Sequence, residues 1–111
     1  MKSEVFVASE EIYGEWSGKY EVKMLIGAES LVIEGVIFKR LQKKGGKVTA
    51  DNYPMILERK LCLVRCITRN GKSITGKDID GMPRRLYTIL FGLYQRLNVP
   101  SQEEADFLSK A

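Results

Sequence analysis

Two cysteines and two aspartates are the residues whose types and spacing could support chemistry. Cys62 and Cys66 are four residues apart, so on a helix they would lie one turn apart on the same face. A zinc site would need further ligands, and the chain contains no histidine. A redox pair is more often spaced Cys-x-x-Cys. Two reduced, buried thiols are therefore expected, because cysteine packs as a small hydrophobic residue.

Asp78 and Asp80 lie in a polar stretch and could ligate a cation, but capping and loop roles fit their position better. The chain has no phosphate loop of the GxxxxGK[ST] type and no Gly-x-Ser-x-Gly elbow. Without histidine it also lacks the commonest general base. We expect a protein that is not an enzyme and that uses no metal, cofactor or small-molecule substrate.

A basic cluster could contact the phosphates of a nucleic acid. The alternative is a solvated helix end whose cations match the negative end of the helix dipole. No aromatic residue lies within the cluster to stack on bases, and the net charge of the chain is only +4. Nucleic-acid binding is thus kept as an alternative function. The cluster consists of Lys39, Arg40, Lys43, Lys44 and Lys47.

Aromatic and arginine residues form a second candidate set, for protein binding. Trp16 is the only tryptophan and lies in a glycine-flanked segment, with Tyr13 and Tyr20 nearby. Tryptophan and tyrosine are common anchors of protein interfaces, although packing in the core is the alternative. Arg84 and Arg85 fall in the first turn of a predicted helix, where cations are mildly unfavourable. Their placement suggests an acidic neighbour or partner.

The N-terminal part, residues 1–26, predicts a β-ribbon. Alternation of polar and apolar residues indicates strands over Ser3–Ala8 and Lys19–Ile26, with Tyr20, Val22 and Met24 on one face. The segment between them, Tyr13–Gly18, is expected to be a turn. A lone ribbon is marginally stable in water, so it should pack on helices or pair with a partner.

The remainder, residues 27–111, predicts three or four helices. The first spans about Ala28–Lys43, with a strand ending near Phe38 as the competing interpretation. The second spans Thr49–Arg69, capped by Asp51 or Asn52 and ended by a turn at Asn70-Gly71. A polar connection, Ser73–Asp80, leads to a third helix over Gly81–Asn98, with Asp80 as its cap. A capping box of Ser101 and Glu104 begins a last helix, Gln102–Ser109, whose Ala105, Phe107 and Leu108 should dock on the body.

Length and composition place the chain among single-domain globular proteins. Its 111 residues, with 44% hydrophobic and 29% charged residues, suit one α+β, mostly helical domain. The N-terminal segment has no long apolar core, so no signal peptide is expected. No apolar run approaches the length of a membrane helix. We therefore expect the cytoplasm as the compartment.

The C-terminal half resembles small tailed-phage proteins of the tail assembly chaperone or baseplate-assembly type. The resemblance covers Thr49–Leu108 and rests on "LCLVRCITRNGKSIT" followed by "GKDIDGMPRRLYTILFGLYQRLNVPSQEEADFL". The shared pattern is a polar aspartate-containing step, a proline-started helix with a leucine and tyrosine stripe, and a Ser-x-Glu-Glu helix. The N-terminal half has no counterpart in it.

This resemblance implies a binding protein without catalytic residues. Its partners would be viral structural proteins or further copies of itself, in the host cytoplasm or the virion. Two alternatives remain: a nucleic-acid-binding accessory protein, and a small host-directed inhibitor that blocks an enzyme with its ribbon.

Overall fold

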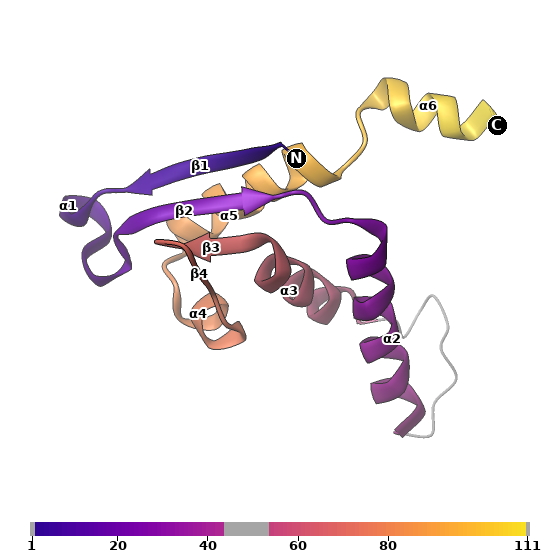
Figure 1. Ribbon diagram of the computed structural model, residues 1–111, viewed down its shortest axis with the longest axis horizontal. Coiled ribbons are helices and arrows are strands. Elements are labelled where there is room, and N and C mark those ends of the chain that lie inside the picture. Colours follow the sequence, from indigo (N-terminus) through magenta and orange to yellow (C-terminus); the bar gives the residue numbers. More distant parts are fainter. Residues whose placement is uncertain (1, 44–53, 111) are drawn as a thin grey trace.

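The computed structural model of the chain describes residues 2–43 and 54–110 (Figure 1). Within them, four strands form one antiparallel sheet in the order β1-β2-β3-β4, surrounded by helices. The strands are β1 (Ser3–Ala8), β2 (Gly18–Lys23), β3 (Ile67–Arg69) and β4 (Lys72–Ser73). The fold is α+β and mostly helical, as the sequence predicts.

The predicted N-terminal ribbon is confirmed as the pair β1 and β2, although β2 ends at Lys23, three residues before the predicted end at Ile26. Their register runs from Ser3 opposite Lys23 to Ala8 opposite Gly18. Alternate side chains of a strand point to opposite faces, so Tyr20 and Val22 lie inward with no exposed surface. Val5 and Val7 are exposed. Helix α5 (Arg84–Asn98) packs across β1 and β2 (Figure 1).

The connection between β1 and β2 is more ordered than the predicted turn. It contains the short helix α1 (Glu10–Tyr13) and the 3-10 turn η1 (Gly14–Trp16). Ser9 caps α1, because its Oγ accepts the Ile12 N–H at 3.4 Å. Gly14 follows with a φ of 54°, a conformation that glycine adopts without strain.

Helix α2 (Gly27–Lys43) confirms the first predicted helix and excludes the competing strand. Ile33 and Ile37 are its buried residues and pack towards α3 (Met55–Cys66). Pro54 precedes α3, as a proline should at a helix start. The predicted cap residues Asp51 and Asn52 lie outside the described residues.

The prediction that the second helix continues to Arg69 is wrong. Helix α3 ends at Cys66, and Ile67–Arg69 forms β3, which pairs with residues 20–22 of β2. Asn70 and Gly71 both have positive φ, at 51° and 82°, which is the geometry of a tight hairpin turn into β4. The β-structure is therefore not confined to residues 1–26.

The polar connection also differs from its prediction. It contains α4 (Gly76–Gly81), which is capped by Thr75 through a reciprocal capping box with Asp78. Helix α5 begins at Arg84 after Pro83, three residues later than predicted. Asp80 lies inside α4, so the prediction that it caps the next helix is wrong.

The last helix, α6 (Gln102–Lys110), begins with the predicted capping box. The Ser101 N–H donates to Glu104 Oε1 at 3.0 Å, and Ser101 Oγ accepts the Glu104 N–H at 3.3 Å. The prediction that α6 docks on the body is wrong, because Ala105, Phe107 and Leu108 are exposed. Figure 1 shows α6 set apart from the sheet at the end of an extended connection.

The main core lies between the sheet and the helices α3 and α5. Its fully buried members include Tyr20, Leu63, Ile67, Leu86 and Leu90. A smaller cluster joins α2 to α3 through Ile33, Ile37 and Cys62. None of the helices in residues 2–43 and 54–110 is long and apolar enough to cross a membrane.

Candidate functional site

The predicted aromatic anchors gather at one end of the molecule, but two of them belong to the core. Tyr13 is 7% exposed and Tyr20 is fully buried, so neither ring is presented to a partner. The Tyr20 hydroxyl donates to the Trp16 main-chain oxygen at 2.7 Å. Burial raises the pKa of that hydroxyl above its ordinary value. Trp16 itself is half-buried against the core.

Arg69, at the end of β3, binds the main chain of the segment that precedes β2. Its guanidinium donates to the Ser17 main-chain oxygen at 2.7 and 3.1 Å and to that of Glu15. It also lies 5.8 Å from the ring centres of Trp16 and Tyr20. The sequence pattern does not single out Arg69, because it predicts a helix through this segment. Its role here is to fix the turn before β2.

The arginine pair lies in the first turn of α5, as predicted, and both side chains are exposed. The Arg85 guanidinium lies over the Tyr13 ring, 5.8 Å from its centre. The structure therefore brings Arg85 beside Tyr13 and gives it an aromatic neighbour. An acidic partner for the pair stays a prediction.

The basic cluster is described only in part. Lys39 and Arg40 are exposed on the C-terminal half of α2. Lys44 and Lys47 lie outside the described residues, as does the side chain of Lys43. Nucleic-acid binding by this cluster stays a prediction.

The cysteine pair is buried and free, as the sequence predicts. Cys62 and Cys66 lie one turn apart on α3, at 7% and 1% exposure. Burial raises the pKa of Cys62, against a hydrogen bond with Tyr94 that lowers it. Burial raises the pKa of Cys66 to about 12. Both are therefore neutral thiols near pH 7, in the form that is a poor nucleophile and a poor metal ligand.

Asp78 and Asp80, the two candidate cation ligands, both make structural contacts. Asp78 Oδ2 accepts the Thr75 N–H at 2.9 Å in the α4 cap, and Asp80 pairs with Lys60 of α3 at 2.8 Å. Among the described residues, no group of three or more acidic, cysteine or histidine side chains could hold a metal ion.

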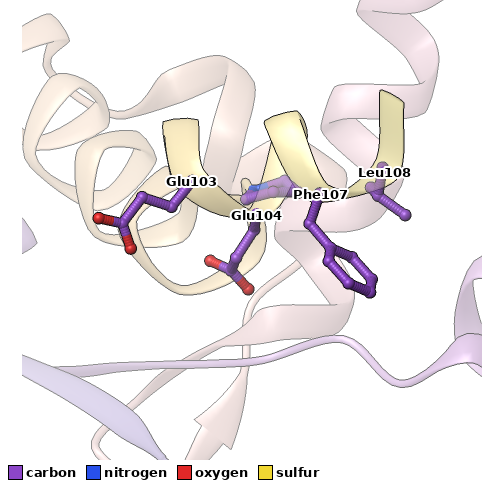
Figure 2. A pocket seen from close by; sticks show the side chains of 5 residues that line it. Glu103, Glu104, Phe107 and Leu108 are labelled. Carbon is purple, nitrogen blue, oxygen red and sulfur yellow. The ribbon is translucent and has the colours of Figure 1, made fainter. Parts of the chain in front are cut away.

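One face of α6 is an exposed surface with apolar and acidic side chains. It carries Phe107 and Leu108, with Glu103 and Glu104 one turn before them, and we call these four residues the α6 face. Figure 2 shows their side chains projecting from the helix. Together with Pro100 they line a pocket of about 370 Å³. Phe107 is 73% exposed. The capping hydrogen bonds from Ser101 lower the pKa of Glu104, so its carboxylate is charged at neutral pH.

A second exposed surface lies on α2, and at Arg40 it borders the packed side, where Arg40 lies beside Pro54 and Leu57. Residues four apart on a helix lie above one another, which arranges this surface in two rows. One row is Leu31, Gly35 and Lys39, and the other is Val32, Val36 and Arg40; all six are exposed. We call them the α2 rows.

Comparison of the chain with protein-family models, with curated proteins and with solved structures found no match. The function is therefore argued from these surfaces.

Proposed function

We propose that the chain is a non-enzymatic protein-binding factor in the assembly of a phage tail or baseplate. It would hold a viral structural protein in the host cytoplasm or remain in the virion. The observation that supports a binding role is the α6 face, which offers an exposed phenylalanine and leucine on a helix that stands off the body. An amphipathic helix of this kind commonly docks in an apolar groove of a partner.

The chemistry of the α6 face narrows the class of partner. Phe107 and Leu108 supply the apolar contact, and Glu103 and Glu104 place two carboxylates beside it. A complementary groove would be apolar and flanked by lysine or arginine. The phage assignment draws on the resemblance of Thr49–Leu108 to tail and baseplate assembly proteins.

Co-expression with phage tail and baseplate proteins, followed by size-exclusion chromatography, tests this function. We expect the chain to co-migrate with one of them. Burial of a phenylalanine contributes about 1.5–3 kcal/mol, so Phe107→Glu should weaken the complex by about tenfold or more. Val7→Glu is the matched control, because Val7 is 69% exposed on β1 and Phe107 is 73% exposed on α6.

The control variant should bind within about twofold of the unchanged chain. Absence of co-migration with every tail and baseplate protein would count against the assembly role. Equal weakening by Phe107→Glu and Val7→Glu would count against the α6 face as the binding surface.

A further inference from the structure

Two exposed surfaces within the described residues match each other in apolar content and in charge. The α6 face begins with two acids and continues with two apolar residues one turn later. The α2 rows begin with apolar residues and end, two turns later, with Lys39 and Arg40. The acids of the α6 face can lie beside Lys39 and Arg40, with the apolar residues of the two surfaces in contact, only if α6 runs antiparallel to α2.

From this match we infer that α6 docks antiparallel on the α2 rows of a second copy of the chain. The inference rests on the proposed protein-binding role of α6 and names one partner for it. Glu103 then lies beside Lys39, and Glu104 lies beside Arg40. The positive N-terminal end of α6 also approaches the negative C-terminal end of α2, which is a favourable dipole arrangement.

The centre of this contact leaves room for the phenylalanine at Gly35, which has no side chain, and we call this position the notch. In the antiparallel register the row of Glu103 and Phe107 faces the row of Leu31, Gly35 and Lys39. Phe107 then sits over Gly35, where an added Cβ would meet no atom within 4 Å. Leu31 beside this notch is 68% exposed. Leu108 lies against Val36 in the neighbouring row.

The chain cannot make this contact with its own α2. The Leu25 N–H donates to Asn98 Oδ1 at 2.7 Å, which holds the end of α5 at the start of α2. Lys39 is about 18 Å from Gly27 at 1.5 Å per helical residue. The connection from Asn98 to Gln102 reaches at most about 14 Å when fully extended.

Figure 1 agrees with this limit, since α6 leaves the body near the start of α2 and the far end of α2 points away from it. The start of α6 therefore reaches Lys39 of another copy and not its own. The α2 rows of the copy that supplies α6 stay free to bind the α6 of a further copy. Two copies therefore form a closed dimer only if each docks its α6 on the α2 rows of the other.

Sedimentation equilibrium at low ionic strength, after nuclease treatment, tests the inference on the full chain. The unchanged chain should self-associate reversibly, and more weakly as salt is added. Glu103→Lys and Lys39→Glu should each weaken self-association by about threefold or more, because each replaces an attraction with a repulsion. Glu104 is left unchanged because it caps α6.

Mixing the two variants is the decisive measurement. In the mixture, Lys at position 103 of one chain meets Glu at position 39 of the other, and the original pair forms in the reverse contact. The mixed association constant should therefore return to that of the unchanged chain. Gly35→Trp fills the notch and should abolish association, while the circular dichroism spectrum stays the same.

Three results would overturn the inference: a chain that stays monomeric at millimolar concentration, a mixture that does not recover, or association that nuclease treatment removes. The last result would assign Lys39 and Arg40 to nucleic acid. A monomeric chain that still co-migrates with a tail protein would overturn this inference and leave the proposed function standing. Self-association without capture of any tail protein would count against the proposed function and leave this inference standing.

Discussion

Arg69 fastens the segment that carries Trp16 to the end of β3, so its removal should be costly. The guanidinium donates to the main-chain oxygens of Ser17 and Glu15 and lies against two aromatic rings. A hydrogen bond from a charged donor contributes about 1.5–3 kcal/mol. The Ser17 contact is partly buried and the Glu15 contact is exposed, so the second contributes less. We expect Arg69→Ala to lower the free energy of unfolding by about 2–4 kcal/mol.

Urea unfolding measures this loss directly. Trp16 is the only tryptophan of the chain, so its fluorescence reports on the segment that Arg69 holds, and circular dichroism reports on the helices. With a slope of about 2 kcal/mol per molar urea, the midpoint should fall by about 1–2 M.

Arg65→Ala is the matched control for this experiment. Arg65 is exposed in the last turn of α3, so its truncation should change stability by no more than about 0.5 kcal/mol. Equal losses for Arg69→Ala and Arg65→Ala would refute the role that we assign to the guanidinium.

Three further perturbations have expected outcomes. Asn98→Ala removes the acceptor of the Leu25 N–H and should cost about 1–3 kcal/mol in thermal or urea unfolding, whereas Asn98→Asp keeps an acceptor and should cost less. Gly71→Ala should cost about 1–2 kcal/mol because φ is 82° there, whereas Gly92→Ala, on an exposed turn of α5, should be neutral or stabilising in the same assay. Burial raises the pKa of Cys66 from 9.0 to about 12, so the unfolded chain loses this proton first and stability should fall as pH rises from 9 towards 12. Cys66→Ser should make that alkaline decline shallower, and an unchanged slope would contradict the assignment.

The elements that local patterns determine were predictable from the sequence. Alternation across β1 and β2, the capping box at Ser101 and the period of α2 each depend on residues within one segment. The end of α3 was not predictable in this way, because Val64 and Ile67 fit a helical stripe equally well. The deciding interaction is the pairing of Ile67 with Val22, which are far apart in the sequence.

For the candidate surfaces too, the local sequence predicts some features and only the tertiary packing determines the others. The pattern of α6 shows that Phe107 and Leu108 need an apolar partner, but it cannot say whether that partner is the same chain. Tyr13 and Tyr20 have the residue types of interface anchors, and only the packed structure places them in the core. Asn70-Gly71 carries a clear turn signal, but the same signal fits the end of a helix as well as a hairpin.

The sheet has a consequence for the order of folding. β1 with β2 and β3 with β4 are each closed by short connections, so each pair can form early from neighbouring residues. The pairing of β2 with β3 must instead close a loop that contains α2 and α3, which is entropically costly. We therefore expect the two hairpins to join late. Substitutions at the β2–β3 seam should then change the unfolding rate more than the folding rate.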